Sequence, residues 1–350
     1  MKIVSTGTAL PPHYYPQETL IAAFRQHWGP RLERFSILER LHMATSVDGR
    51  YLTLPIEAYP KLKRWGEAND IWIEAAQELG QQAICRALDA AGIDRDQIAA
   101  LFFVSISGVC SPSIDARLVN RMRLNRNIKR IPIFGLGCVA GAAGLARAAD
   151  YVKAYPEQVA VLLSVELCSL TLQQDDLSTA NLISVGLFGD GAAAAVVAGE
   201  RAASTDGPEI IATKSVFYPD TERVMGWDIS EKGFQIVLSK QVPEVVEANL
   251  GQDADLFLAE HGLTRSDIGS WVLHTGGPRV LEATATALGL PDNALAVSWE
   301  CLRRTGNLSS ASVLFVLEEV MRNRRPPPGT WGMLAAMGPA FCSELLLLRW

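Results

Sequence analysis

The stretch 135–152, GLGCVAGAAGLARAADYV, contains the side chain best suited to covalent chemistry, Cys138. This cysteine stands in a turn of small residues, after the apolar run 131–134 and before an alanine-rich segment that we expect to be a helix. A thiol in that position faces the positive end of the helix dipole and unpaired backbone N–H groups, and both favour the nucleophilic thiolate. Because free cysteines are often buried, the competing interpretation is a structural cysteine in a helix packed through Gly and Ala.

Two side chains in the second half of the chain suit the same chemistry. His274 ends an apolar run at 270–273 and enters a Gly-Gly-Pro turn, and functional residues concentrate where a strand becomes a loop. Asn307 follows Gly306 in a similar turn, RRTGNLSSAS. The alternatives are a structural histidine and a helix N-cap asparagine. The other four histidines lie on predicted surface helices or near the terminus: His13, His27, His42 and His261.

Together these three side chains predict thiolate chemistry on an acyl group. The Cys138 thiolate would attack a thioester and hold the acyl chain as a new thioester. A neutral imidazole N–H from His274 and an amide N–H from Asn307 can both donate to one carbonyl oxygen, and so stabilise the enolate that forms when a malonyl thioester loses CO2. As an imidazolium, His274 would also lower the pKa of Cys138. One ring cannot be cation and neutral donor at once, so its protonation state must change through the cycle.

The composition is that of a soluble globular protein, with 350 residues, of which 49% are hydrophobic and 20% charged. A net charge of −6 does not suggest binding to nucleic acid. We expect neither a signal peptide nor a transmembrane helix, because no apolar run is long enough. The six cysteines are scattered without a CxxC pair, which supports neither a zinc site nor a disulfide framework and favours a reducing cytoplasm.

Alternating strand and helix patterns predict an α/β body made of two similar halves that join near residues 200–210. We expect strands at 1–9, 100–107, 131–134, 158–167, 191–199, 235–238, 270–273, 331–337 and 342–350. We expect helices at 17–43, 69–91, 114–124, 243–261 and 308–323, besides the one that follows Cys138 and one that follows the turn at 274–280 and runs through Leu288. In the helix at 69–91, Asp70 is the expected cap and Gly92 the expected end.

Five motifs in this order resemble the type III polyketide synthases, the chalcone-synthase-like group. They are GLGCVAGAAG (135–144), LFGDGAA (187–193), HTGGP (274–278), TGNLSSAS (305–312) and MGPAF (337–341). The resemblance covers nearly the whole chain and implies a thiolase-like five-layered αβαβα fold, with the nucleophile in an N-terminal half at 1–205 and the histidine and asparagine in a C-terminal half at 206–350. It implies a homodimer, a triad of Cys138, His274 and Asn307, and CoA thioesters as substrates, with no cofactor and no metal.

The same resemblance assigns residues to the substrate pocket. Phe188 matches the aromatic gatekeeper between the CoA tunnel and the cavity, with core packing as the alternative. Ile236 lies where plant chalcone synthases have a second gatekeeper phenylalanine, and Ser111 where they have a methionine that lines the cavity of the partner subunit. Cys168 replaces a small hydroxyl residue on the wall. Two further wall residues match the family: Thr171 and Ser309.

Two parts of this predicted pocket depart from the family pattern. Ala340 stands where most members have glycine, so the floor near Pro339 is expected to shift. Among the basic residues that contact CoA in the family, only Arg40 matches, which puts the phosphate site in doubt. Arg40 belongs to the basic helical segment 17–43, whose charges are otherwise those of a solvated face.

Several stretches look most like the bacterial alkylresorcinol and alkylpyrone synthases, among them GEANDIWIE (66–74) and SELLLLRW (343–350). Such enzymes extend a fatty acyl starter with malonyl-CoA and cyclise the product. The smaller pocket residues would leave room for an alkyl chain, whose burial contributes about 0.8 kcal/mol per CH2. The predicted partners are therefore malonyl-CoA and a long-chain acyl-CoA or acyl carrier.

Three other functions remain open at this stage. The first is a type III synthase with malonyl or aromatic starters and a naphthalene- or phenylacetyl-type product. The second is a single condensation of the ketoacyl synthase III kind, although the residues that follow His274 differ there. The third is a catalytically silent scaffold of the same fold, against which the intact Cys138, His274 and Asn307 argue.

Overall fold

The computed structural model describes residues 1–202 and 206–350. Within these ranges the strands of both halves join in one nine-stranded sheet, in the order β11-β12-β13-β8-β1-β7-β6-β4-β5. The strands from the first half are β1 (Lys2–Ala9), β4 (Ile98–Val104), β5 (Lys129–Ile133), β6 (Val159–Leu167) and β7 (Asp190–Ala198). Those from the second half are β8 (Glu209–Phe217), β11 (Ile268–Leu273), β12 (Trp331–Gly338) and β13 (Cys342–Arg349).

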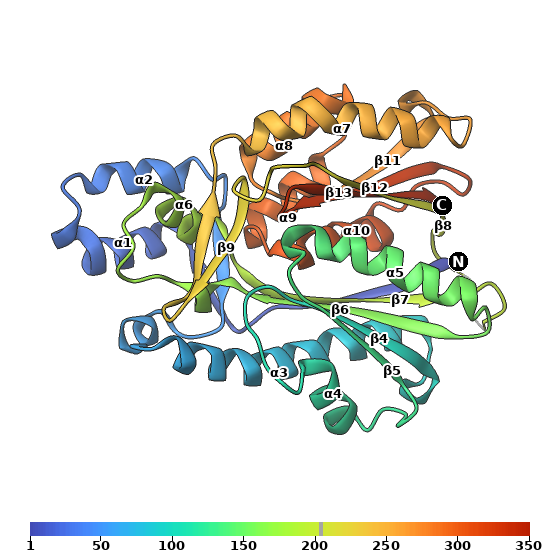
Figure 1. The fold of residues 1–350 in the computed structure, drawn as a ribbon, viewed down its shortest axis with the longest axis horizontal. Helices are drawn as coiled ribbons and strands as arrows, with labels where there is room; N and C mark the ends of the chain where they lie inside the picture. Colours follow the sequence, from blue (N-terminus) through green and yellow to red (C-terminus); the bar gives the residue numbers. More distant parts are fainter. Residues whose placement is uncertain (203–205) are drawn as a thin grey trace.

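The sheet bends where β1 meets β8, so that its two parts face each other across a middle layer of helices (Figure 1). That middle layer is formed by α5 (Ala140–Ala154) and α10 (Ser312–Asn323). The outer layers are α3 (Trp65–Ala91) with α4 (Ile114–Met122) on one side, and α7 (Val242–Ala259) with α8 (Pro278–Leu288) on the other (Figure 1). The predicted five-layered αβαβα arrangement is therefore confirmed.

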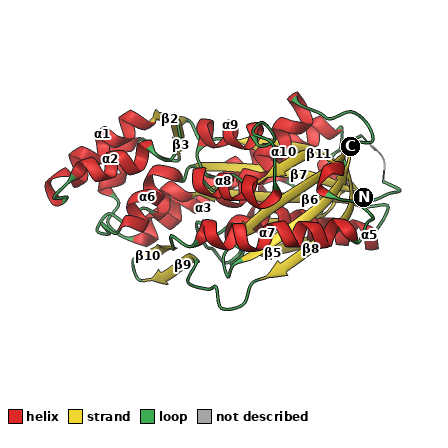
Figure 2. Cartoon of the chain, turned by 90° about the horizontal axis from the view of Figure 1, so that it is seen from above, coloured by secondary structure: helices red, strands yellow, loops and turns green. Residues whose placement is uncertain are grey.

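The remaining elements lie mostly at one end of the layered body, as the view from above shows (Figure 2). They are α1 (Gln17–Trp28), α2 (Phe35–Met43), α6 (Thr179–Leu187) and two hairpins, β2–β3 (His13–Pro16, Gly49–Leu52) and β9–β10 (Met225–Ser230, Gly233–Leu238). One further helix, α9 (Ala296–Thr305), precedes α10 and contacts it.

The central strands of the first half are buried on both faces. Every residue of β6 and of β7 is buried, and apart from Ser164 and Glu166 in β6 and Asp190 and Gly191 in β7 both strands consist of Ala, Val and Leu. Alternate residues of β7 pack into two separate cores, one toward α5 and α10 and one toward α3. This explains why the sequence lacks a polar alternation there.

Most predicted elements are present, and the errors have local causes. The long α3 begins at Trp65, where Arg64 and Glu67 form a capping box, so the cap at Asp70 was wrong. Gly92 ends the helix in the left-handed conformation, as expected. The helix expected at 17–43 is interrupted by a short 3-10 turn at Gly29–Arg31, which contains Pro30. Strand β8 was not predicted, and the boundary expected after residue 205 lies at residues outside the described ranges.

A glycine sets the approach of the two central helices. A Cβ on Gly141 of α5 would clash with the backbone oxygen of Ser310 and would lie 2.7 Å from Cγ1 of Val313 in α10. Both obstacles belong to the packed middle layer, which has little room to move. The close packing of α5 against α10 therefore requires glycine at this position.

We predict that Gly141→Ala lowers the free energy of unfolding by about 2 kcal/mol and the apparent Tm by about 3 °C. The matched control is Gly66→Ala in α3, because a Cβ there meets nothing within 4 Å. This control should be neutral or slightly stabilising, since alanine is the better helix former. Thermal unfolding followed by circular dichroism measures both, and an unchanged Tm in Gly141→Ala would contradict the packing described here.

Candidate active site

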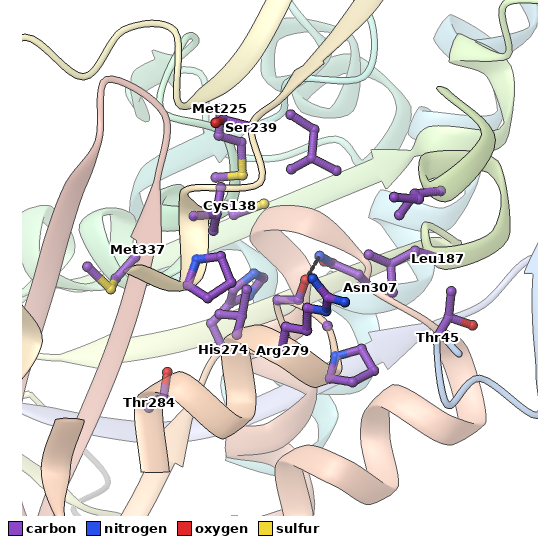
Figure 3. Close-up of a pocket in the computed structure, with 18 of the residues that line it drawn as sticks. Thr45, Cys138, Leu187, Met225, Ser239, His274, Arg279, Thr284, Asn307 and Met337 are labelled. Atoms are coloured by element: carbon purple, nitrogen blue, oxygen red, sulfur yellow. Dashed lines mark hydrogen bonds between the residues drawn. The ribbon is translucent and has the colours of Figure 1, made fainter. Parts of the chain in front are cut away.

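Three side chains that are distant in sequence line one cavity of about 570 Å3 (Figure 3). Cys138 lies in the short 3-10 turn Gly137–Val139, directly before α5. His274 directly follows β11, and Asn307 lies between α9 and α10. The structure thus brings together the nucleophile from the first half and the two donors from the second, as the sequence predicts.

Burial controls the chemistry of Cys138. The residue is 6% exposed, and its Sγ lies 3.5 Å from Oγ of Ser309. Burial raises the pKa of the thiol to about 12, which outweighs the hydrogen bond from Ser309 that favours the thiolate. The backbone N–H of Cys138 also favours the thiolate, as the position before the helix predicts, but burial has the larger effect on the pKa.

A tight turn holds the thiol in place. Gly137 has φ +55°, a conformation that suits glycine. A Cβ on Gly137 would lie 2.6 Å from Cδ of Pro339, so this proline supports the turn from the opposite half. Ala340 also has a positive φ, of 71°. This backbone conformation suits the glycine that most family members have here, and it is strained for alanine.

His274 is also held in its neutral form. Burial lowers the pKa of its imidazole to about 4. Its Nδ1 has no hydrogen-bond partner among the described residues, so no carboxylate there stabilises an imidazolium. The expectation that a resting imidazolium lowers the pKa of Cys138 thus meets a large desolvation cost. A neutral imidazole that lines the same cavity as a thiol can instead act as the base that removes the proton.

Hydrogen bonds to its side-chain oxygen hold Asn307 in place, and its side-chain nitrogen can still donate a hydrogen bond into the cavity. Its Oδ1 accepts hydrogen bonds from the backbone N–H of Ser309 at 2.8 Å and from Oγ of Ser312 at 3.3 Å. Its Nδ2 donates to the carbonyl of Gly276 at 3.3 Å. One amide hydrogen remains for a ligand. The N-cap alternative for Asn307 was wrong, because the N-cap residues of the following 3-10 turn (Ser309–Ala311) and of α10 are Leu308 and Ala311.

Phe188 lies between two cavities. It lines both the main cavity and a second cavity of about 80 Å3. The second cavity is lined by two other predicted pocket residues, Cys168 and Thr171, and by Trp227. The backbone of Phe188 is fixed from both sides, because its carbonyl accepts from Nη1 of Arg50 at 2.6 Å and the residue forms a β-bridge with Asn307. This position suits a partition that separates the cavities.

The other predicted pocket residues fall into two groups, one close to Cys138 and one that lines neither cavity. Ser309 and Pro339 lie beside Cys138 or its turn. Ile236 lines neither cavity, whereas Leu238, two residues further along the same strand, lines the main one. Ser111 and Arg40 are exposed and line neither cavity.

Sequence reasoning missed a buried carboxyl near both cavity thiols. Glu166 in β6 accepts a hydrogen bond from Oγ of Ser107 at 2.8 Å, another from the backbone of Ile106 at 3.1 Å, and a third from Ser310. It raises the pKa of Cys138 and that of Cys168, and burial raises its own pKa. A single glutamate inside an otherwise apolar strand was the available signal.

The fold and the Cys–His–Asn site define a thiolase-like acyltransferase. The chain belongs to the chalcone and stilbene synthases: the model of their N-terminal domain matches residues 1–201, and the model of their C-terminal domain matches residues 209–350. The resemblance stated from the motifs is confirmed.

Comparison with individual proteins shows which members of this family the chain is similar to. The chain is 51% identical to the 1,3,6,8-tetrahydroxynaphthalene synthase of Streptomyces peucetius subsp. caesius, over 99% of this chain and 93% of that protein. It is 37% identical to a putative chalcone synthase of Bacillus subtilis, over 99% and 98%. The crystal structure of 1,3,6,8-tetrahydroxynaphthalene synthase from Streptomyces coelicolor A3(2), a bacterial type III polyketide synthase, matches with a TM-score of 0.95 at 32% identity, over 100% of this chain and 99% of that one. The protein is accordingly a type III polyketide synthase.

Two kinds of feature are absent from the described residues. No helix there has the length and apolar character needed to cross a membrane. No group of three or more His, Cys, Asp or Glu side chains there is arranged to hold a metal ion.

We predict that thiolate formation at Cys138 depends on His274. In His274→Gln, the buried thiol keeps a raised pKa and loses its base, so the alkylation rate should rise about tenfold per pH unit to pH 9 without a plateau. The wild type should react faster at pH 7, because the imidazole accepts the proton.

Iodoacetamide labelling of the peptide that contains Cys138, quantified by mass spectrometry, measures these rates. His261→Gln is the control, because His261 is an exposed residue beyond the end of α7. Identical pH profiles in His274→Gln and wild type would contradict this role of His274.

Proposed function

We propose that this enzyme uses malonyl-CoA both to start and to extend the chain, and that its product is 1,3,6,8-tetrahydroxynaphthalene. The observation that carries this proposal is the 51% identity, over 99% of the chain, to a synthase of that name. The fatty acyl starter expected from the motifs receives no support from the names of these relatives. The alternative with malonyl starters therefore becomes the leading hypothesis.

Carbon counting fits this proposal. A naphthalene skeleton has ten carbons, and each malonyl unit leaves two carbons after it loses CO2, so five malonyl-CoA molecules supply the product. No acyl group from another source is needed. The methylene and carbonyl carbons of such a chain alternate, which places oxygen atoms at alternate positions of the rings.

In the proposed loading step, His274 takes the proton of Cys138, and the sulfur attacks the thioester carbonyl of malonyl-CoA. The bond to the CoA sulfur breaks, and CoA leaves with a proton from His274. In each extension, another malonyl-CoA loses CO2, and the electron pair of the broken bond forms an enolate. Asn307 and the neutral His274 donate hydrogen bonds to the enolate oxygen. The enolate carbon then bonds to the acyl carbon, and the bond to the sulfur of Cys138 breaks. The extended chain is now a thioester of CoA, and Cys138 attacks it again and releases CoA before the next extension.

The separation of the two cavities supports a compact, folded chain over an extended alkyl chain. Phe188 stands between the main cavity, which contains Cys138, and the smaller cavity with Cys168 and Thr171. A growing polyketide that stays on the near side of Phe188 must fold back on itself. Folding back brings a carbonyl and a methylene of the same chain together, as ring closure requires.

We also propose a homodimer that works in the cytoplasm without a cofactor or metal. Strand β5 is at the edge of the sheet, and Phe134, which follows it, is 51% exposed. Such an edge offers unpaired backbone groups and apolar surface to a second copy. All six cysteines are free, which suits a reducing compartment.

We predict that purified enzyme given malonyl-CoA alone releases tetrahydroxynaphthalene, detected by liquid chromatography and mass spectrometry. Adding acyl-CoA starters from acetyl- to palmitoyl-CoA should leave it the main product. Cys138→Ser should reduce turnover by at least about a thousandfold. Cys85→Ser in α3, outside both cavities, is the matched control and should retain activity. Malonyl-CoA consumption only in the presence of a fatty acyl-CoA, with an alkylpyrone or alkylresorcinol product, would instead establish the fatty acyl starter.

We predict that Phe188→Ala joins the two cavities and admits longer starters. The ratio of octanoyl-CoA to malonyl-CoA use should rise by up to about fourfold for each methylene that gains an apolar contact. The control is Phe217→Ala, because Phe217 is 58% exposed at the end of β8. Competition assays with both starters measure the ratio. A ratio equal to that of the wild type would refute the proposed separating role of Phe188.

A further inference from the structure

Arg50 is a buried cation that the proposed chemistry does not use. It lies in β3, is 3% exposed and lines the smaller cavity on the far side of Phe188. Burial lowers the pKa of its guanidinium to about 10, and the charge of Asp190 limits this fall, so the side chain stays charged at neutral pH. Because a buried charge is costly, a cation at this position indicates a specific role.

The guanidinium of Arg50 holds the backbone of the residue that separates the two cavities. Its Nη1 donates to the carbonyl of Phe188 at 2.6 Å. Its Nε has no hydrogen-bond partner among the described residues. The charge is therefore directed at one backbone carbonyl, and a charged donor makes this bond stronger than one between neutral groups.

The aliphatic part of the same side chain covers the glycine that precedes Asn307. A Cβ on Gly306 would lie 3.1 Å from Cδ and 3.2 Å from Cγ of Arg50. Gly306 has φ +72°, a conformation that suits glycine. Arg50 therefore contacts two segments at once, the one that contains Phe188 and the one that leads into Asn307.

These two segments are paired through their backbones. The N–H of Asn307 donates to the carbonyl of Leu187 at 2.9 Å, and the carbonyl of Asn307 accepts from the N–H of Gly189 at 3.0 Å. Phe188 lies between these two partners and forms the β-bridge with Asn307. The backbone position of Asn307 thus depends on the segment that Arg50 holds.

We propose that Arg50 is a positioning residue for the amide donor of Asn307. It fixes the backbone on both sides of the bridge and so keeps Nδ2 of Asn307 directed at the enolate oxygen. In the described structure Arg50 makes no hydrogen bond with Cys138 or His274, which belong to the turn before α5 and to the end of β11. The inference rests on the proposed function, in which the amide acts when malonyl-CoA loses CO2 and not when the thiol is activated.

We predict that Arg50→Met lowers the release of CO2 from carboxyl-labelled malonyl-CoA by about tenfold to a hundredfold, through kcat and not through KM. Arg50→Lys keeps the charge and one donor, so its rate should lie between those of Arg50→Met and the wild type. The double variant Arg50→Met/Asn307→Ala should be no slower than Asn307→Ala alone, because the donor to be positioned is already absent. Iodoacetamide labelling of Cys138 should keep the rate and the pH profile of the wild type in Arg50→Met.

Hydrogen–deuterium exchange followed by mass spectrometry tests the same role without the reaction. In Arg50→Met, the N–H groups of Asn307 and Gly189 should exchange at least about tenfold faster than in the wild type, because the pairing of their segments loosens. Peptides around Cys138 should exchange as in the wild type. This difference separates a local effect on Asn307 from a general loss of stability.

Arg265→Met is the matched control for both measurements. Arg265 also donates to backbone carbonyls, those of Gly251 and Ala287, but it lines neither cavity. This variant should leave both the CO2 release and the exchange at Asn307 unchanged.

Any of three results would overturn the proposal. Additive losses of rate in the double variant would mean that Arg50 acts independently of Asn307. An equal fall in the labelling rate of Cys138 would indicate a general effect on the fold. Unchanged exchange at Asn307 in Arg50→Met would mean that its backbone does not need this support. If the wild type releases no CO2 from malonyl-CoA, the proposed function fails, and the exchange data still decide whether Arg50 positions Asn307.

Discussion

The loss of solvent around Cys138 is the constraint on which the rest of the site depends. The thiol lies in the interior of the fold, where burial raises its pKa to about 12 and lowers that of His274 to about 4. In such surroundings a permanent thiolate is costly, and a nucleophile forms only by transfer of a proton to a neighbour that is itself neutral. The same surroundings strengthen the hydrogen bonds that His274 and Asn307 can donate to an enolate, because water does not compete for that oxygen.

The two halves of the five-layered fold together form these buried surroundings, because each half contributes residues that pack against the other. The middle helices α5 and α10 pack so closely that Gly141 is required, and the turn before α5 carries Cys138. Pro339, from the connection between β12 and β13, supports that turn from the opposite half. A change in how the halves approach each other would therefore move the nucleophile relative to its donors.

The sequence predicts the positions of the triad better than its electrostatics. Cys138, His274 and Asn307 are predictable because each lies where a strand or helix meets a turn that contains glycine, and turns at element ends gather at one place in an α/β fold. The pKa of Cys138 could not be predicted that way, since the degree of burial is a tertiary property. Helix and strand positions were mostly right, but Asp70 was chosen as a cap although the capping box lies further upstream.

The periphery of the site was the least predictable part. Leu238 lines the main cavity, and the predicted Ile236 does not. The sequence does not reveal the register of the β9–β10 hairpin, which decides which of these side chains faces the cavity. Glu166 was hidden within an apolar strand, although its carboxyl contributes to the electrostatics of both cavity thiols.

The central claim is that Cys138 carries the growing chain. Rapid mixing of the enzyme with malonyl-CoA, acid quenching and peptide mass spectrometry test it most directly. We predict covalent masses that correspond to an acyl starter and successive two-carbon additions on the peptide that contains Cys138. The same adducts on the peptide with Cys168, or an unmodified Cys138 during turnover, would contradict the account.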